Sequence, residues 1–315
     1  MSARSEPRGV PDGSWDLDGI VAEPGELRDA SQKDRYAGRQ LPELLSRSAI
    51  IGIVDGLVAA LYPRHFGPIG LSEDGLDLYV ADTIDQALHT LRQQVRRELQ
   101  LLDVDNAHAR GELDRAALDI VASFARDLPR IRALLDNDIV AAFEGDPAAK
   151  SVDEVVFCYP GVAAIIRHRI AHRLYLLGVP MLARIIAELA HAQTGIDIHP
   201  GAQIGESFFI DHGTGVVIGE TARIGRRVRL YQAVTLGAKR FDVDENGAIV
   251  KGGDRHPIIE DDVVIYAGAT ILGRITIGRG SSIGGSVWLT KSVPPESTIT
   301  QAKARNENFD GGAGI

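Results

Sequence analysis

The chain has 315 residues, of which 44% are hydrophobic, with 34 Lys and Arg against 43 Asp and Glu and a formal net charge of −9. This length and composition exclude a disordered or fibrous protein and leave room for two domains with a large core. The acidic balance argues against nucleic acid as a partner. No window approaches the roughly 18 uninterrupted apolar residues of a membrane span. We therefore expect a soluble, cytoplasmic protein with no membrane partner.

The N-terminal stretch 1–33 is polar and rich in Gly, Pro, Asp and Glu. It has no basic start followed by an apolar run, so we expect a disordered acidic tail and no signal peptide. The single cysteine, Cys158, excludes an intramolecular disulfide and a cysteine-ligated zinc. Judged by residue type, Cys158 is expected to be buried as a small apolar side chain.

Residues 34–195 show the periodicity of helices. Apolar residues recur on one helical face and predict helices over 41–61, 84–99, 113–124 and 131–143, with Pro129 near a helix start. Asp146-Pro147 then breaks the pattern, because the residue before a proline is pushed out of the helical region. Segments 161–177 and 181–192 predict a helical hairpin. We expect a helical N-terminal domain over 34–195.

From residue 196 an apolar residue returns every six positions, a period that fits neither a helix nor an ordinary strand. A fixed short period is typical of a solenoid. We therefore predict an α+β chain whose second domain is a left-handed parallel β-helix over 196–300. An inserted loop over 238–257 interrupts the repeat, and loops on a rigid scaffold often carry function. Residues 301–315 are expected to form a flexible tail.

The repeat also predicts a pair of side chains. Ile198, Ile204 and Ile210 lie on three successive faces, so Ile218 returns to the first face, one coil further on. Asp197 and His212 then occupy the same corner in neighbouring coils, and stacked strands are about 4.7–4.9 Å apart. A histidine is suited to remove a proton from a hydroxyl, and an aspartate on its other nitrogen fixes the tautomer. The register alone predicts an Asp–His dyad.

A series of short motifs carries a resemblance to a known family. In order and spacing, the motifs are similar to the signature series of serine acetyltransferases, over residue 146 to about 300 and the last two residues: Asp146-Pro147-Ala148, Arg169-Ile170-Ala171-His172, Asp197-Ile198-His199-Pro200, Asp211-His212-Gly213-Thr214-Gly215, Gly219-Glu220-Thr221 and Gly253-Asp254-Arg255-His256-Pro257. The resemblance implies transfer of acetyl from acetyl-CoA to the hydroxyl of L-serine. The product, O-acetylserine, serves cysteine biosynthesis.

The same resemblance implies roles for individual residues. His212 is the general base and Asp197 its partner. The motif residues Asp146-Pro147 and Asp211 hold the amine of serine, while Arg255 and His256 hold its carboxylate. The pantetheine arm of CoA would lie along the coil edge near Gly237, Ala238 and Ala267. No metal is implied. Segment 220–305 carries more basic than acidic residues, which suits a phosphorylated ligand as well as a plain solvated surface.

The resemblance also implies partners. Relatives bury the flat faces of the coil in a homotrimer or a dimer of trimers, which places His212 of one chain near His256 of the next. The chain ends in Gly314-Ile315, and relatives use a C-terminal isoleucine to bind O-acetylserine sulfhydrylase. The alternative for this end is a frayed terminus.

Two other classes remain open from the residues. One is a hexapeptide acyltransferase for a different hydroxyl, such as that of a sugar or an antibiotic, which has no need of the amino-acid motifs. The other is a non-catalytic or metal-bearing coil of the γ-carbonic anhydrase type, using His199, His212 and His256. Asp197 beside His212 and Arg255 beside His256 are poor neighbours for zinc.

Overall fold

The computed structural model describes residues 15, 17–36, 42–103, 108–240, 244–245 and 247–301. The chain divides into two compact units, Met1–Glu43 and Leu44–Ile315. This division differs from the boundaries that the sequence predicts at 33 and 195. The predicted tail over 301–315 lies outside the described residues, apart from Gln301.

The first unit contains helix α1, Leu17–Tyr36, where the sequence predicts a disordered tail over 1–33. Its described side chains are mostly exposed. Its Glu, Leu, Ala, Arg and Gln residues are good helix formers, whereas Gly19, Pro24 and Gly25 within it are poor ones. Of the seven Gly and Pro residues in 1–33, four lie before residue 17 and three, Gly19, Pro24 and Gly25, lie within α1.

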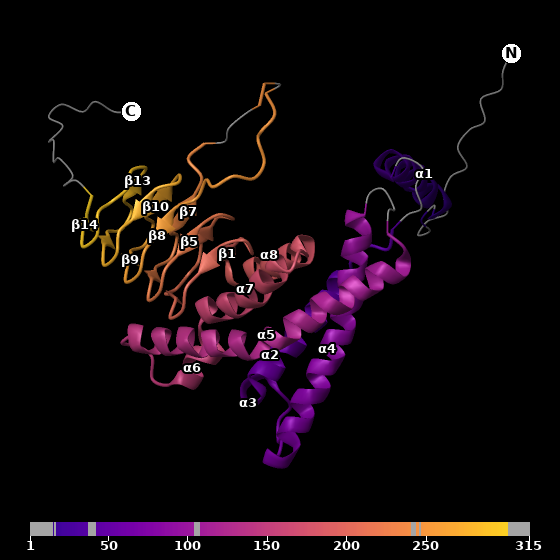
Figure 1. Cartoon of the computed structure of the whole chain (residues 1–315), viewed down its shortest axis with the longest axis horizontal. Helices are drawn as coiled ribbons and strands as arrows, with labels where there is room; N and C mark the ends of the chain where they lie inside the picture. The colour runs from indigo at the N-terminus through magenta and orange to yellow at the C-terminus, as the bar shows by residue number, and fades with distance from the viewer. Residues whose placement is uncertain are drawn as a thin grey trace. The chain divides into compact units, whose positions relative to one another are not determined.

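The second unit begins with helices and ends with short strands (Figure 1). The helices are α2 (Arg47–Leu61), α3 (Pro63–Phe66), α4 (Glu73–Leu102), α5 (Arg110–Gly145), α6 (Val152–Cys158), α7 (Pro160–Leu176) and α8 (Pro180–Thr194). The predicted hairpin corresponds to α7 and α8, and the predicted break at Asp146 is the C-cap of α5. Among the described residues, no helix combines the length and apolar character that crossing a membrane requires.

Helix α5 corrects the prediction of two helices meeting near Pro129, because Pro129 lies inside one continuous helix. A proline inside a helix removes a hydrogen bond and costs about 3 kcal/mol. Leu128 and Ile131, on either side, are 6% and 4% exposed and belong to the core. Tertiary burial of this face therefore outweighs the local cost. Cys158 also differs from expectation, since it is exposed at the end of α6.

The strands form three parallel sheets around the inward apolar residues. The first sheet contains β1 (Asp197–Ile198), β4 (Val217–Ile218), β7 (Thr235–Gly237), β10 (Thr270–Leu272) and β13 (Trp288–Leu289). The second contains β2 (Gln203–Ile204), β5 (Arg223–Ile224), β8 (Ile258–Ile259) and β11 (Thr276–Ile277). The third contains β3 (Phe209–Ile210), β6 (Arg229–Leu230), β9 (Val264–Ile265), β12 (Ser282–Ile283) and β14 (Thr298–Ile299).

The register of the coil agrees with the sequence period. Ile198 pairs with Ile218, and Ile218 pairs with Leu236, so the slip after Ile210 does not shift the stack. Strand β7 ends at Gly237 and β8 begins at Ile258, so the intervening segment leaves the coil and returns to it. The first coil is anchored on the helices, because α8 contacts β1 while α5 and α7 contact β3. One apolar core runs through both regions.

Candidate active site

The predicted base lies at a tight corner between β3 and β4. His212 has a positive φ of 58°, a left-handed conformation that costs energy for most residues with a side chain. Ser207, Arg227 and Asp262 adopt the same conformation at other corners of the coil. The strain therefore belongs to the repeat, which turns the chain sharply and leaves the His212 side chain 72% exposed. Its Nε2 atom lies 3.8 Å from Oδ1 of Asp211.

Asp146 lies close to this corner, at the end of α5. The hydroxyl of Tyr159 donates to its Oδ2 atom, and the backbone N–H of Ala148 donates to Oδ1 at 2.8 Å. These two hydrogen bonds, with the charges of His212 and Arg229, hold the pKa of Asp146 below its usual value. The carboxylate is thus anionic at neutral pH, as recognition of an ammonium group requires. Pro147 forms the turn that follows.

A second group of polar side chains surrounds the end of the inserted loop. Arg255 Nη2 donates to Glu220 Oε2 at 2.6 Å, and the hydroxyl of Tyr175 donates to Glu220 Oε1 at 2.9 Å. The backbone N–H groups of Arg255 and His256 both donate to Thr221 Oγ1, at 3.0 and 3.1 Å. These contacts fix the loop against the coil.

His256 is buried and held as a neutral ring. Burial, followed by the charge of Arg255, lowers its pKa to about 4. The N–H of Thr221 donates to its Nδ1 atom at 3.1 Å, so the ring proton lies on Nε2. Gly219 makes room for the ring of His256, because a β-carbon at residue 219 would lie 2.0 Å from Nε2 of that ring. Only glycine allows the coil to approach the ring so closely.

Arg274 supports the same loop from the next coil. Its Nη1 atom donates to the carbonyl oxygens of Thr221 and His256 at 2.7 and 2.9 Å, and its Nη2 atom donates to Asp254 at 2.8 Å. Neither Arg274 nor Tyr159 was singled out from the sequence, because their partners lie far away in the chain. Glu220 belongs to the motif Gly219-Glu220-Thr221, but the sequence does not indicate a role for it.

The site residues therefore form two groups within one chain. Asp146, Asp211 and His212 lie at the first corner, and Arg255 and His256 lie beside Glu220. Among the described residues, no hydrogen bond or ion pair joins one group to the other. That these two groups make up one serine site stays a prediction.

Asp197 precedes Ile198 at the start of β1, as the register requires. Within the ranges that the structure describes, no hydrogen bond or ion pair connects it to His212, and the Asp–His dyad stays a prediction. The Asp197 carboxylate instead groups with Glu188 and His191 of α8, with one ligand atom from each lying within 4.8 Å of the others. In the described part of the chain this is the one group with metal-ligand geometry.

The predicted metal ligands of the alternative class are not together. His199 Nδ1 accepts from the N–H of Gly201 at 3.0 Å, and its ring meets that of Tyr175 edge-on. Burial is the first cause of the lowered pKa of both His199 and His256, and the charge of His199 lowers the pKa of His256 further. His212 belongs to the other group.

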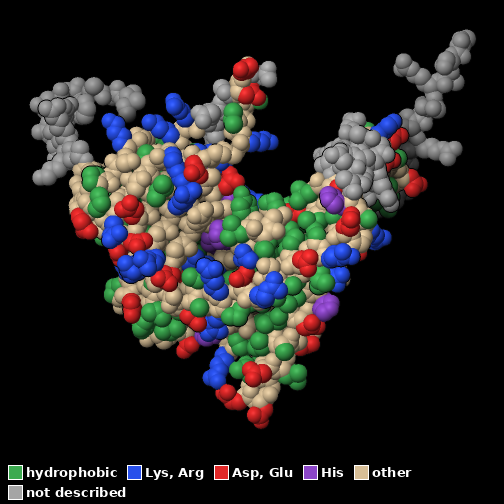
Figure 2. All heavy atoms as spheres, viewed as in Figure 1, with side chains coloured by type: hydrophobic (Ala, Val, Ile, Leu, Met, Phe, Trp, Pro, Cys, Tyr) green, Lys and Arg blue, Asp and Glu red, His purple; other side chains and the backbone are tan. Residues whose placement is uncertain are grey.

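The three residues predicted for CoA lie around the first sheet. Gly237 ends β7 and is followed by Ala238, at the point where the inserted loop begins. Ala267 lies at the corner before β10, where the next residue, Gly268, donates to the carbonyl oxygen of Gln232. Because Gly237 pairs with Leu272, Ala267 lies at the opposite end of this sheet from Gly237. Figure 2 shows Lys and Arg side chains gathered over the visible face of the β-helix.

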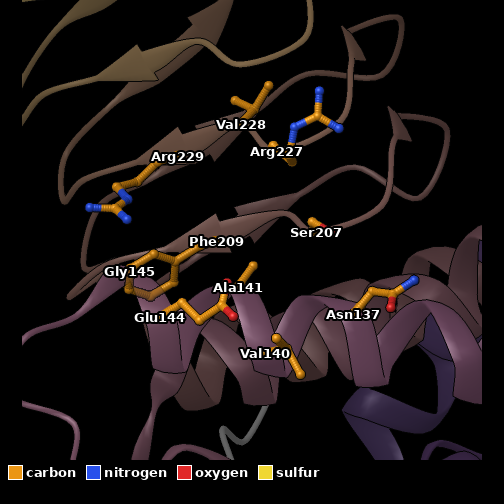
Figure 3. Close-up of a pocket in the computed structure, with 10 residues that line it drawn as sticks. All are labelled: Asn137, Val140, Ala141, Glu144, Gly145, Ser207, Phe209, Arg227, Val228 and Arg229. Carbon is orange, nitrogen blue, oxygen red and sulfur yellow. The ribbon is translucent and has the colours of Figure 1, made fainter.

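A pocket of about 390 Å³ lies between α5 and strands β3 and β6 (Figure 3). Arg229 reaches over the ring of Phe209, with 5.3 Å between the guanidinium carbon and the ring centroid. The walls of the pocket also include Glu144 and Gly145, which directly precede Asp146 in the sequence. None of the predicted site residues lines this pocket.

The fold and the site define the class to which the chain belongs. Residues 256–291 match the family model "Bacterial transferase hexapeptide (six repeats)", so the coil is that of a hexapeptide-repeat transferase. The serine acetyltransferase (plasmid) of Synechococcus elongatus is 55% identical over 305 residues, 96% of each chain. The chain belongs to the serine acetyltransferase family, whose members are acyltransferases.

Solved structures agree with this assignment. The Entamoeba histolytica serine acetyltransferase 1 in complex with L-cysteine has a TM-score of 0.70 and 33% identity, covering 90% of this chain and 97% of its own. The soybean serine acetyltransferase complexed with serine has a TM-score of 0.52 and 33% identity, covering 80% and 96%. These comparisons confirm the predicted family and the predicted helical region followed by a left-handed β-helix.

Proposed function

We propose that the chain transfers the acetyl group of acetyl-CoA to the hydroxyl of L-serine, giving O-acetylserine for cysteine biosynthesis in the cytoplasm. The observation that carries this proposal is that the two groups of site residues differ in charge, with carboxylates beside His212 and a guanidinium beside His256. The anionic Asp146 and Asp211 lie beside His212, and the cationic Arg255 is held with His256 in a second group. A zwitterion with one hydroxyl, such as serine, needs both.

The catalytic step uses His212 as a general base. Its imidazole takes the proton from the serine hydroxyl as the oxygen attacks the thioester carbonyl carbon. The carbon–sulfur bond then breaks, and the imidazolium returns the proton to the CoA thiolate. We propose that Asp197 orients the ring, with the carboxylate of Asp211 lying 3.8 Å from its Nε2 atom.

Two residues would bind the carboxylate of serine by different chemistry. Arg255 offers a permanent charge, whereas the neutral His256 offers the N–H on Nε2. Binding of L-cysteine to the Entamoeba histolytica enzyme supports this proposal, because cysteine carries the same ammonium and carboxylate. We propose that Gly237, Ala238 and Ala267 contact the pantetheine arm of CoA.

The complete site would form between chains of a homotrimer, or of a dimer of trimers. The two groups of site residues have no bond to each other within one chain, which supports a site completed by His256 of a neighbouring chain. We also propose O-acetylserine sulfhydrylase as a partner through Ile315, a residue outside the described part of the structure.

The direct test is an acceptor panel. The purified chain is incubated with acetyl-CoA and, separately, L-serine, L-homoserine or a set of sugars, while free thiol release is followed and products are identified by mass spectrometry. We expect O-acetylserine as the dominant product. Dominant acetylation of a sugar would identify another acyltransferase, and no thiol release with any acceptor would contradict the proposal.

A further inference from the structure

Among the residues that the structure describes, Glu220 is the one acidic side chain paired with Arg255, and both side chains are 28% exposed. Both oxygens of its carboxylate are used. Oε2 accepts from Arg255 at 2.6 Å, and Oε1 accepts from the hydroxyl of Tyr175 at 2.9 Å. Glu220 follows β4 in the coil, whereas Tyr175 is in the last turn of α7 and Arg255 ends the inserted loop. Three separate parts of the chain therefore meet at one carboxylate.

The contact keeps Glu220 charged. Burial would raise the pKa of its carboxyl, but the hydrogen bonds from Arg255 and Tyr175, together with the charges of His199 and Arg255, lower it overall. A charged acceptor makes a shorter and stronger bond to a guanidinium than a neutral one does. Arg255 has a long and flexible side chain, so without this bond it would lose the fixed orientation that binding a carboxylate requires.

The contact also leaves Arg255 able to bind a second anion. A guanidinium has five N–H donors, and the structure uses two of them, one to Glu220 and a long 3.4 Å contact from Nη1 to the carbonyl oxygen of Gly253. Glu220 occupies one edge of the planar group. The remaining donors have no partner among the described residues, and a planar carboxylate is the geometry that arginine binds best.

We propose that Glu220, held by Tyr175, is a positioning residue that fixes Arg255 for the carboxylate of the acceptor amino acid. This inference rests on the proposed function. It adds that α7 takes part in acceptor recognition, because the hydroxyl that fixes Glu220 comes from that helix.

The test is steady-state kinetics of the full chain, with L-serine and acetyl-CoA varied in turn. For Glu220→Gln we expect the KM for L-serine to rise about tenfold, the size of one hydrogen bond to a charged group. The KM for acetyl-CoA should not change. Tyr175→Phe should raise the KM for L-serine in the same direction by a smaller factor, and Glu220→Asp should recover part of the loss.

Glu206→Gln is the matched control. Glu206 occupies the same place in an earlier hexapeptide, after Ile204-Gly205, and its nearest cation, Arg226, is 3.9 Å away and exposed. Its kinetics should equal those of the wild type. If Glu220→Gln raised both KM values equally, or neither, the positioning role would be wrong. Should that variant fail to fold, an unchanged KM for L-serine in Tyr175→Phe would overturn the inference.

Failure of the proposed function gives a different result. In that case the wild-type chain itself forms no O-acetylserine, whatever the variants do. An active wild type with unaffected Glu220→Gln and Tyr175→Phe variants would contradict only the positioning role.

Discussion

His212 shows how the repeat and the chemistry meet at one residue. The left-handed corner at which it lies occurs elsewhere in the coil with Ser207, Arg227 or Asp262. The backbone conformation is thus explained without reference to function. What distinguishes this corner is the pair of carboxylates near His212. Asp211 lies 3.8 Å from the ring, and the charge of His212 helps to lower the pKa of Asp146.

We expect His212→Ala to reduce kcat by roughly 10²–10⁴-fold, the contribution typical of a general base. Asp197→Asn should leave measurable turnover, because it misplaces the base without removing it. His89→Ala, on the exposed side of α4, is a suitable control. The measurement is kcat at saturating L-serine and acetyl-CoA, and a wild-type kcat for His212→Ala would exclude this mechanism.

Four histidines, of which two are buried and two half-buried, predict a pH dependence of stability. His168, His172, His199 and His256 all have a pKa lowered first by burial, in the case of His256 to about 4. The unfolded chain therefore binds more protons than the folded chain below the ordinary histidine pKa of about 6.5. Stability is full above that pH and is lost as the pH falls from about 6.5 towards 4.

We expect the free energy of unfolding, measured with urea at pH 7.5 and pH 5.5, to be lower at the acid pH. His168→Gln should make that difference smaller, since His168 is only 3% exposed and stacks on His172 with 5.5 Å between ring centroids. The comparison is made within each variant, so a general loss of stability does not affect it. An identical difference in both proteins would show that His168 does not contribute.

At the scale of elements, a buried ion pair joins the helices to the coil. Arg169 of α7 donates from Nε and Nη2 to the carboxylate of Asp138 in α5, both at 3.0 Å, and also donates to the carbonyl oxygens of Ile204 and Gly205. The N–H of Phe208 donates to the same carboxylate at 2.8 Å. Burial raises the pKa of Asp138 to about 6 despite these partners.

Removing one partner of this pair should be strongly destabilising. We expect Arg169→Ala to cost about 3–5 kcal/mol of unfolding free energy, because it leaves a buried carboxylate without its counter-charge. Arg184→Ala removes an exposed pair with Glu188 and should cost at most about 0.5 kcal/mol. The urea midpoints of the two variants provide the comparison. Equal midpoints would show that the buried pair does not hold α5 and α7 on the coil.

At the scale of the whole molecule, the division of the site residues into two groups predicts that each active site contains residues of two chains. Chains carrying His212→Ala and chains carrying Arg255→Ala should each be inactive or nearly so. In mixed assemblies some sites then combine an intact His212 with an intact Arg255, so activity should partly return. Light scattering should give at least the mass of a trimer. A fully active monomer would contradict a shared site.

The C-terminal residues give a separate prediction for the whole molecule. Deleting Gly314-Ile315 should abolish co-elution with O-acetylserine sulfhydrylase, since capture of a terminal carboxylate by backbone donors depends on that end group. Acetyl transfer should be unaffected. Retained co-elution would show that the tail does not carry this contact.

The sequence by itself determined the coil, the helical hairpin and the family. A period of six fixes which residues face inward, and the pairing of Ile198 with Ile218 follows from counting faces. Local patterns are sufficient here, because each coil contacts mainly its neighbours. The same counting places Asp197 and His212 at one corner, but it cannot orient their side chains.

Only the tertiary structure decided the contacts between distant elements. Tyr175 and Glu220 are brought together from a helix and a coil, and Arg274 reaches back to Thr221. Pro129 stays within α5 because packing on both sides compensates for the lost hydrogen bond. No local pattern encodes such contacts. They depend on how α7 and the inserted loop pack against the coil, a free-energy balance among many side chains at once.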